Sequence, residues 1–365
     1  MKANKKAALF FVNSFTGGGA ERVCFDLIRH ISTNEEVKIV VLDGENDYGE
    51  IPSSCSILNL GIPRDWPFPK RLSKMMSHLS SVNSFIGDVE QYDLITAHLN
   101  ASQIIARLSS VREKTLYVMH GAQKAEKKKK LLHDLMIKFL FGNNHRIICV
   151  SDGIKQELAE EYSIDPRRCE VIYNPLDTEK IRQELIEDSS VDVEGPFVLA
   201  AGRLHEIKRF DRLLEIFSAM KLDDMKLVII GEGRERTRLE SIAKALGIEK
   251  KVVFPGFQKN PYAWMASSSL FFCCSDSEAF PVGLLEALYC GARVVSADCD
   301  YGPREILTDD LSNFLVNPID DVEQYVAKGY EALRSYPAIS ASYFNRFSLE
   351  NVAKQYKEHW RKCFV

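Results

Sequence analysis

Apolar positions fall in short runs that alternate with amphipathic stretches, and this alternation continues along almost the whole chain. Short runs rich in Val, Ile, Leu and Phe predict buried strands, whereas apolar residues spaced three and four apart predict helices. In the first half, Val23, Leu27 and Ile28 share one face of a helix that begins near Ala20. The predicted strands of this half are residues 8–13, 37–43, 94–97, 116–119, 147–150 and 171–175.

The alternation starts again after a charged, weakly apolar stretch at residues 178–194, which predicts a connecting helix and a linker. Near the end of the chain, Ser348 is placed to cap a last helix over residues 352–360. The predicted strands of the second half are residues 197–201, 227–231, 252–255, 270–274 and 293–297, with helices at 209–220 and 235–246 between them.

Strands that alternate with helices are typical of α/β folds with parallel, doubly wound sheets. The 365 residues of the chain exceed what one hydrophobic core usually serves. We therefore expect two Rossmann-like domains, at residues 1–177 and 196–345, with a linker at 178–195 and a terminal segment at 346–365. Ligands of such sheets bind beyond the carboxyl ends of the strands, so we expect the domains to face each other across a cleft.

The composition is that of a globular protein and favours neither a nucleic-acid-binding nor a membrane-spanning protein. With 45% hydrophobic and 27% charged residues the chain has an ordinary globular composition, and its net charge of −4 gives no reason to expect nucleic acid as a partner. The nine cysteines include no CxxC pair, which favours reduced thiols in a cytoplasmic protein. The apolar run at 7–12 is too short for a signal peptide, and no run reaches the length of a membrane span.

The segment 275–288 offers the most chemistry. It follows a predicted buried strand and passes through Pro281 and Gly283 into a helical pattern. The backbone N–H groups of a helix's first turn bind phosphate, and carboxylates accept hydrogen bonds from hydroxyl groups. Glu278 in the loop and Glu286 near the first turn of the helix therefore suit a nucleotide-sugar.

Two further strand ends in the second half carry candidate groups. Gly202 permits a sharp turn, and Arg203 and Lys208 then offer two cations that suit a diphosphate. Gly231 begins a Gly-Glu-Gly turn where a ribose or a base could lie. Solvated surface charge and a plain structural turn are the competing interpretations of these two motifs.

Three glycines, Gly17 to Gly19, follow the first predicted strand. A glycine turn before a helix lets the backbone approach an anion or an acceptor, although a simple tight turn has the same sequence. The dinucleotide-binding fingerprint is excluded, because Arg22 stands where its third glycine is required.

Histidines stand at several predicted strand ends. His120 ends a strand of the first half, where an imidazole can hydrogen-bond a sugar hydroxyl or assist a leaving group. His98 and His205 also end strands and compete for this role.

A DxD triplet runs from Asp298 to Asp300. Such a triplet binds a divalent metal in one class of sugar transferases. Because Arg203 and Lys208 can already offset the charge of a diphosphate, we interpret the triplet as a coincidence and expect no metal and no cofactor.

Taken together, these motifs resemble the retaining glycosyltransferases of family 4, which have the GT-B fold. The resemblance runs in order from Gly17 to Glu305 and rests on GGGAER, GRLHEIKRF, GEG and EAFPVGLLE. The chain is similar to bacterial members that build lipopolysaccharide, capsule and related glycans. The resemblance implies an acceptor-binding first domain, a nucleotide-sugar-binding second domain, and a terminal helix that packs back on the first domain.

The resemblance also implies roles for the site residues. Arg203 and Lys208 would bind the donor diphosphate, Glu278 would contact the transferred sugar, and Glu286 would hold the ribose hydroxyls. His120 matches the family's active-site histidine in place. Transfer would retain the anomeric configuration without a covalent enzyme intermediate. The other donor-binding positions are Gly18, Gly19, Gly231, Phe280, Pro281, Val282, Gly283 and Leu284.

We therefore expect an enzyme that moves a hexose or N-acetylhexosamine from a UDP-sugar, or else a GDP-sugar, to a glycan or a lipid-linked saccharide. A nucleotide-sugar epimerase of the same fold and an inactive nucleotide-binding or membrane-tethering relative are the alternatives. The segment from Glu278 to Glu286 favours the transferase over the epimerase, and the intact Arg203 and Lys208 argue against the inactive relative.

A basic, apolar segment at residues 124–140 is a candidate membrane or acceptor patch, and residues 66–71 are a second. Lysines at the start of a helix oppose its dipole, a cost that contact with anionic lipid or a lipid-diphosphate acceptor would offset. A core helix with a solvated basic end explains the pattern equally well, so peripheral binding to the inner face of the cytoplasmic membrane is expected only under the first interpretation. The residues concerned are Lys127, Lys128, Lys129 and Lys130, followed by the stripe Leu131, Leu132, Leu135, Met136, Phe139 and Leu140.

Replacing residues 127–130 by glutamate tests the membrane interpretation. Each lysine near an anionic surface contributes about 1 kcal/mol, so binding to anionic vesicles should fall at least ~10-fold in a flotation assay. Glutamate at Lys244 and Lys250, in the second half, provides the control. Unchanged flotation of the 127–130 variant would reject the membrane interpretation.

Overall fold

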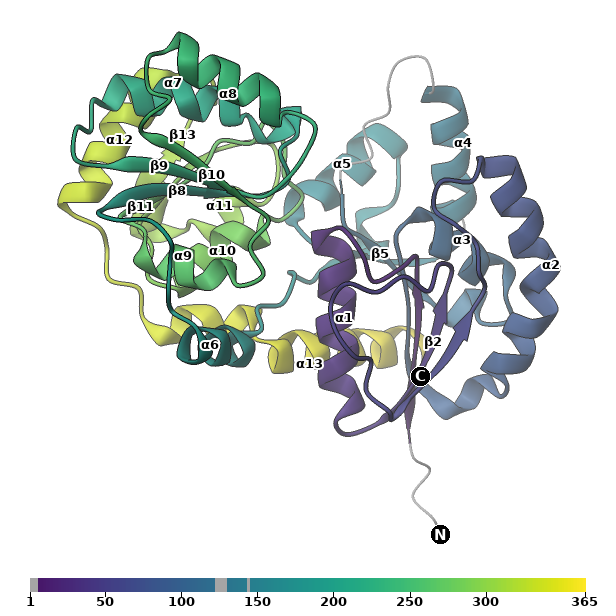
Figure 1. Cartoon of the computed structure of the whole chain (residues 1–365). Helices are drawn as coiled ribbons and strands as arrows, with labels where there is room; N and C mark the ends of the chain where they lie inside the picture. Colours follow the sequence, from purple (N-terminus) through teal and green to yellow (C-terminus); the bar gives the residue numbers. More distant parts are fainter. Residues whose placement is uncertain (1–5, 122–129, 143–144) are drawn as a thin grey trace. The chain divides into compact units, whose positions relative to one another are not determined.

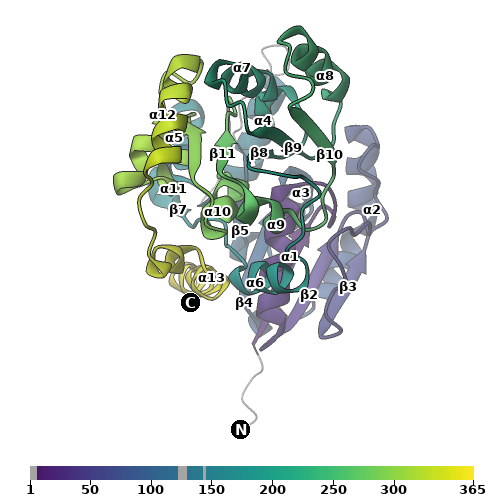
Figure 2. The same cartoon turned by 60° about the vertical axis from the view of Figure 1, so that its left-hand side comes forward.

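The structure is a computed structural model, and it describes residues 6–121, 130–142 and 145–365. The chain divides into two compact units, the first made of Met1–Pro175 with Arg346–Val365 and the second of Leu176–Asn345. Each unit contains its own parallel sheet covered by helices (Figures 1 and 2). The stretch expected to connect the units contains α6 (Thr178–Glu187), which belongs to the second unit.

The first unit is built on a parallel sheet with the strand order β3-β2-β1-β4-β5-β6-β7. The order reverses between β1 and β4, which are neighbours in the sheet. Parallel strands that are buried on both faces read as continuous apolar runs, as in β1, where all six residues are buried. The strands are β1 (Ala7–Val12), β2 (Glu36–Val41), β3 (Cys55–Asn59), β4 (Tyr92–His98), β5 (Leu116–Met119), β6 (Arg146–Cys149) and β7 (Cys169–Val171).

Helices cover both faces of this sheet. Since crossover connections are right-handed, the reversal at β1 and β4 places α1 on one face and the later helices on the other. The last helix of the chain, α13, packs on α1 and β4, while α3 packs between α2 and α4. The helices are α1 (Gly19–Ser32), α2 (Phe68–Ile86), α3 (Asn100–Leu108), α4 (Lys130–Phe141), α5 (Asp152–Tyr162) and α13 (Leu349–Phe364).

The second unit repeats this plan with the strand order β10-β9-β8-β11-β12-β13. The reversal lies between β8 and β11, so the loops after these two strands diverge to opposite sides of the sheet. One apolar core packs α7 and α12 against the strands. The strands are β8 (Phe197–Ala201), β9 (Lys226–Ile230), β10 (Val252–Gly256), β11 (Leu270–Cys273), β12 (Val294–Ala297) and β13 (Leu315–Val316). The helices are α7 (Phe210–Met220), α8 (Arg236–Ala245), α9 (Pro261–Ser267), α10 (Val282–Tyr289), α11 (Pro303–Ile306) and α12 (Val322–Arg334).

Most predicted strands are confirmed within two residues, but some expectations were wrong. The strand expected at 171–175 is β7, which ends at Val171. The buried face of α4 differs from the predicted apolar stripe. It contains Ile137, Leu140 and Phe141, of which only Leu140 was predicted, whereas Leu135 and Phe139 of the predicted stripe are exposed. Residues 127–129, which hold three of the four candidate lysines, lie outside the described residues.

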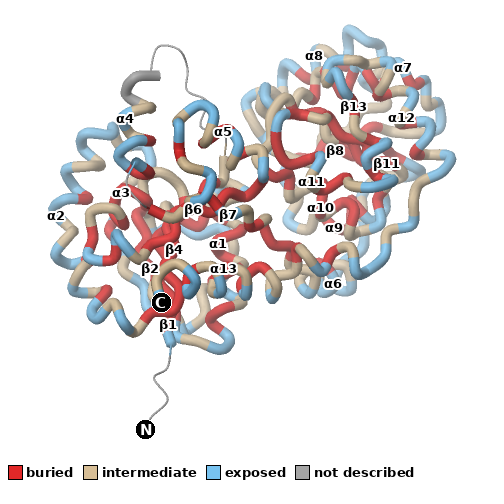
Figure 3. The backbone as a smooth tube through the Cα atoms, turned by 180° about the vertical axis from the view of Figure 1, so that it is seen from behind, coloured by how far each residue is buried: buried red, intermediate tan, exposed pale blue. Residues whose placement is uncertain are grey.

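The terminal helix α13 is part of the first unit's core, as Figure 3 shows by the buried positions along it. Ser348 caps it as predicted, its hydroxyl oxygen accepting the backbone N–H of Asn351 at 3.2 Å. Trp360 is 2% exposed and donates its indole N–H to the carbonyl of Lys114 at 2.7 Å. Packing, this hydrogen bond, and the ion pairs of Arg361 with Asp93 and Lys357 with Glu35 therefore fix the helix to the first unit.

Among the described residues, no helix is long and apolar enough to cross a membrane.

Replacing Trp360 tests how much the first unit depends on this helix. Trp360→Ala removes a buried ring and its hydrogen bond, so the free energy of unfolding should fall by about 3–5 kcal/mol. Trp360→Phe keeps most of the apolar volume and should cost less, about 1–2 kcal/mol. Urea denaturation gives both values, with the exposed Lys354→Ala as control. A Trp360→Ala variant as stable as the control would contradict the assignment of α13 to this core.

Candidate active site

Glu278 lies in the loop after β11, where two donors reach the same carboxylate oxygen. Lys208 Nζ lies 2.6 Å from Glu278 Oε1, and Ser275 Oγ donates to Oε1 at the same distance. The side chains of Lys208 and Glu278 are 30% and 12% exposed, and Ser275 is buried. Within the described part of the chain, no hydrogen bond is formed with the other oxygen, Oε2, which leaves it available for a ligand hydroxyl.

The charge of Lys208 is stabilised by this contact. Burial alone would lower the pKa of the Lys208 ammonium, but the Glu278 carboxylate raises it above the ordinary lysine value. Lys208 is therefore a cation at neutral pH. Because an ammonium has three N–H donors, Lys208 can hold Glu278 and still donate to a phosphate.

Glu286 is the fifth residue of α10 and begins its second turn, just beyond the first turn near which the sequence predicted it. Tyr262, which is 5% exposed and lies on α9, donates its hydroxyl to Glu286 Oε1 at 3.1 Å. Tyr262 could not be predicted as a partner of Glu286, because no local motif relates two residues that are twenty-four positions apart. One carboxylate oxygen is thus oriented by a buried phenol.

The start of α10 presents backbone donors rather than side chains. Pro281 stands at the N-cap position without a side-chain hydrogen bond, and Gly283 leaves open space where a Cβ would otherwise project. Phe280 and Leu284 are buried, so the predicted contribution of this segment to a ligand would come from backbone N–H groups. Helix dipole and donors together favour an anion at this position.

Two of the turns near this segment need glycine. A Cβ on Gly231, whose φ is +128°, would lie 2.0 Å from the carbonyl oxygen of Gly202. A Cβ on Gly302, whose φ is +83°, would lie 2.6 Å from Pro281 Cδ. Since side chains cannot fit there, Gly231 lets the turn after β9 pack closely on the turn after β8, and Gly302 lets the turn after β12 pack on the loop before α10. Arg203, beside Gly202, is exposed at the end of β8.

The glycine turn of the first unit is held by side chains from outside it. Gly18 is the N-cap residue of α1, and its N–H donates to the Tyr48 hydroxyl at 3.0 Å, while that hydroxyl donates to the Gly18 carbonyl at 2.8 Å. Glu21 is 4% exposed and pairs with Arg64 at 3.2 Å. The predicted turn is therefore an ordered element, and Glu21 and Tyr48 are structural partners that the sequence did not reveal.

Two of the three competing histidines come together in the first unit. His98 Nδ1 lies 2.8 Å from His120 Nε2, and His98 Nε2 lies 3.1 Å from Thr96 Oγ1. The sulfur of Cys24 lies within 4.8 Å of a nitrogen of each ring. The distance between these two histidine nitrogens is that of a hydrogen bond, so one nitrogen carries the proton and donates while the other accepts the hydrogen bond. His205 belongs to the second unit and accepts the N–H of Ile207 at 3.3 Å.

Both rings of this pair are neutral at physiological pH. Burial lowers the pKa of His120 to about 4. Burial, and then repulsion from His120 once that ring is protonated, lower the pKa of His98 well below the ordinary value. A neutral His120 can donate or accept a hydrogen bond, but it is not an imidazolium that could act as a general acid at pH 7.

The DxD triplet has a structural partner. Arg304 lies 2.9 Å from Asp298, whose side chain is only 14% exposed. The first carboxylate of the triplet is therefore engaged by a protein side chain, and the interpretation of the triplet as a coincidence stays a prediction.

Comparison with known proteins places these features in a family. Residues 17–180 match the family model described as Glycosyltransferase Family 4, and residues 181–343 match Glycosyl transferases group 1. A Campylobacter jejuni protein is 30% identical over 348 residues and covers 92% of both chains. The chain belongs to glycosyltransferase family 4.

The names of two relatives of this glycosyltransferase describe sugar transferases. The Campylobacter relative is N-acetylgalactosamine-N,N'-diacetylbacillosaminyl-diphospho-undecaprenol 4-alpha-N-acetylgalactosaminyltransferase. The lipopolysaccharide 1,6-galactosyltransferase of Escherichia coli is 28% identical over 179 residues, which is 47% of this chain and 48% of that one.

Solved structures confirm the predicted GT-B fold of this glycosyltransferase. Anabaena HepE, in complex with UDP and glucose, gives a TM-score of 0.71 at 19% identity, over 98% of this chain and 100% of that one. The lipopolysaccharide outer core galactosyltransferase WaaB, in its apo form, gives 0.72 at 19% identity, also over 98% and 100%.

The histidine pair predicts how stability changes with pH. An unfolded histidine binds a proton below about pH 6.5, whereas folded His120 resists protonation until about pH 4. Stability is therefore full above pH 6.5 and is lost as the pH falls toward 4. His120→Gln should lose about 2 kcal/mol less than the wild type between pH 7 and pH 4.5, as measured by urea denaturation. His30→Gln, at the end of α1, is the matched control, and equal acid sensitivity of all three proteins would contradict the lowered pKa of His120.

Proposed function

We propose that this glycosyltransferase moves a hexose or N-acetylhexosamine, with retention of configuration, from a UDP-sugar to a glycan or lipid-linked saccharide acceptor. The proposal rests on the group formed by Lys208, Ser275 and Glu278, which precedes the start of α10. No side chain of the described residues caps the backbone N–H groups at that helix start. It joins a cation, an oriented carboxylate and backbone donors within one unit. A nucleoside diphosphate-sugar requires these three kinds of contact.

In this proposal the second unit binds the donor. Arg203 and Lys208 neutralise the diphosphate, whose negative charge grows as the bond to the sugar breaks. Backbone N–H groups at the start of α10 add donors on the same charge. Glu278 Oε2 accepts a sugar hydroxyl and Glu286 accepts a ribose hydroxyl, so the two carboxylates orient the donor and neither acts as a nucleophile.

Relatives support the choice of substrates. HepE was solved with UDP and glucose, which favours a uridine donor here. The Campylobacter relative carries a diphospho-undecaprenol acceptor in its name, which favours a lipid-linked diphosphate acceptor. We assign acceptor contacts to the first unit, with His120 hydrogen-bonded to a hydroxyl of the reacting sugars and Gly19 near the acceptor or the diphosphate. No metal or cofactor takes part in this proposal.

A lipid-linked acceptor suits a first unit that contacts the membrane peripherally. Phe68 and Met76 on α2, and Leu135 and Phe139 on α4, are large apolar side chains between 45% and 56% exposed. Lys70 lies over the ring of Trp66 at 3.5 Å in the same basic segment. Both helices contact α3, so they lie on the same side of the sheet. Apolar side chains among lysines are typical of interfacial binding.

Glu278→Gln tests the assignment of the donor site. The amide keeps the shape of the side chain but weakens the acceptor for the sugar hydroxyl and the charge beside Lys208, so kcat should fall at least ~100-fold. UDP release from UDP-sugars in the presence of a lipid-diphosphate-linked saccharide measures it. UDP should still raise the melting temperature of the variant, since Glu286 and Arg203 are intact. Glu240→Gln, which breaks an exposed pair with Arg236, is the control, and near-normal turnover of Glu278→Gln would overturn the assignment.

A further inference from the structure

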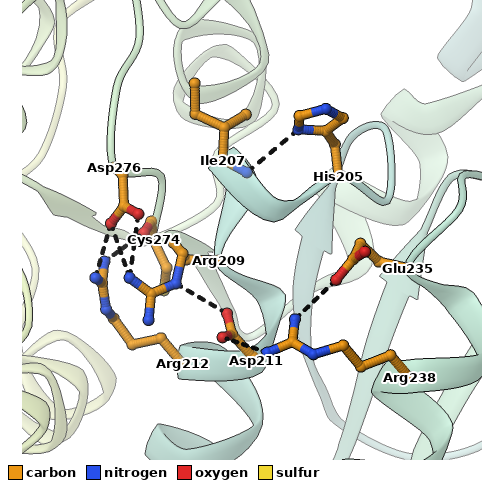
Figure 4. Close-up of polar contacts among 9 residues, drawn as sticks. All are labelled: His205, Ile207, Arg209, Asp211, Arg212, Glu235, Arg238, Cys274 and Asp276. Atoms are coloured by element: carbon orange, nitrogen blue, oxygen red, sulfur yellow. Dashed lines mark hydrogen bonds and ion pairs between the residues drawn. The ribbon is translucent and has the colours of Figure 1, made fainter. Parts of the chain in front are cut away.

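Asp276 precedes Glu278 by two residues and is held by two arginines from the start of α7. Arg209 Nη1 lies 3.1 Å from both carboxylate oxygens, and Arg212 Nη2 lies 2.8 Å from Oδ1 (Figure 4). Neither arginine contacts Glu278 itself in these hydrogen bonds. The carboxylate of Asp276 is thus occupied by protein groups on both of its oxygens.

Arg212 fixes the loop from within the protein. Its side chain is 3% exposed, and its Nη1 also donates to the carbonyl of Cys274 at 2.8 Å. A buried guanidinium needs partners for its donors, because an unpaired buried charge is unfavourable. Its position therefore determines where the backbone at Cys274 and the carboxylate of Asp276 can lie.

Lys208 and Arg209 are neighbours in sequence but reach different carboxylates. Arg209 has φ +50°, a left-handed conformation that separates the 3-10 helix η5 (Glu206–Lys208) from α7. This turn sends Lys208 to Glu278 and Arg209 to Asp276. A non-glycine residue in this conformation carries a cost that surrounding contacts must offset.

A backbone hydrogen bond joins the same two segments. The N–H of Asp276 donates to the carbonyl of Ile207 at 2.9 Å. The other end of the Arg209 guanidinium, Nε, lies 3.0 Å from Asp211, which Arg238 also contacts at 3.3 Å. Two nitrogens of the Arg209 guanidinium, Nε and Nη1, are therefore held by Asp211 and Asp276, and neither contacts Lys208 or Glu278 in these hydrogen bonds.

We infer that Asp276, held by Arg209 and Arg212, is a positioning residue that fixes Glu278 and Lys208 relative to each other for transfer. The inference rests on the proposed function, because it assigns Glu278 to the donor sugar. The contacts of Asp276 connect the loop after β11 to η5 and the start of α7. Without them, three contacts would still connect the two segments: the backbone bond to Ile207, the bond of Arg212 to the Cys274 carbonyl, and the pair of Lys208 with Glu278. None of these three holds the Asp276 side chain.

Asp276 also borders a cavity of about 560 Å³, which Arg209, Asp211 and Glu235 line as well. A residue beside a cavity could contact the substrate directly. The occupied carboxylate of Asp276 argues for the positioning role, and the experiment below distinguishes the two.

The test compares Asp276→Asn with a matched variant, Asp211→Asn. Both remove one carboxylate from Arg209, but Asp211 makes no contact with the loop after β11 in Figure 4. We expect kcat for Asp276→Asn to fall 10- to 100-fold while the Kd for UDP changes less than ~3-fold, and Asp211→Asn to stay within ~3-fold in both. Asp276→Glu, which keeps the charge, should recover part of the lost kcat.

A double variant separates positioning from direct contact. If Asp276 acts through Glu278, adding Asp276→Asn to Glu278→Gln should lower kcat by less than ~3-fold further, whereas an independent contact with substrate would multiply the two losses. Multiplied losses, or normal kcat for Asp276→Asn, would overturn the inference. Should Asp276→Asn fail to fold by circular dichroism, Arg209→Gln carries the same comparison, with an expected 3- to 10-fold loss of kcat. A wild-type protein that releases no UDP from any donor would instead overturn the proposed function and with it the role of Asp276.

Discussion

All strands within each sheet run in one direction, and this constraint determines where the chemistry of the protein can lie. Parallel strands bring their carboxyl ends to one edge, and helices must cross back to the opposite edge before the next strand. After β8 and after β11 the chain crosses toward opposite edges of the sheet. No crossover helix in the described part of the chain therefore occupies the space between the loops that follow these two strands. Residues far apart in sequence, such as Lys208 and Glu278, meet at this point for that reason.

Meeting at an edge does not by itself fix side chains. Loops have more conformational freedom than strands, and long charged side chains lose rotamer entropy when they are held. The second unit offsets this with partially buried ion pairs, in which a lower local dielectric strengthens attraction and reduces screening. Ser275 and Tyr262 add directed hydrogen bonds that orient one oxygen of each carboxylate.

Much of this fold was predictable, because continuous apolar runs at strand spacing mark buried parallel strands. The pattern failed at the edges of the sheets. β3 is an edge strand with mostly exposed residues, and β13 has only two residues, so neither produces an apolar run. Glu278, Glu286, Lys208 and Arg203 could be singled out by residue type and position after a strand. The partners of Asp276 and Glu286 could not, since Arg209, Arg212 and Tyr262 acquire meaning only through tertiary contacts.

The return of α13 to the first unit has a consequence for how the gene is organised. The first unit is made from both ends of the chain, and the second is one uninterrupted segment inserted between Pro175 and Arg346. Arg203, Lys208, Glu278 and Glu286, which we assign to the diphosphate, the transferred sugar and the ribose, lie inside this insertion. An exchange of that single segment between relatives would therefore carry the whole set together, and the core around Trp360 would not be divided. A change of donor and a change of acceptor could thus arise separately in the history of such a chain.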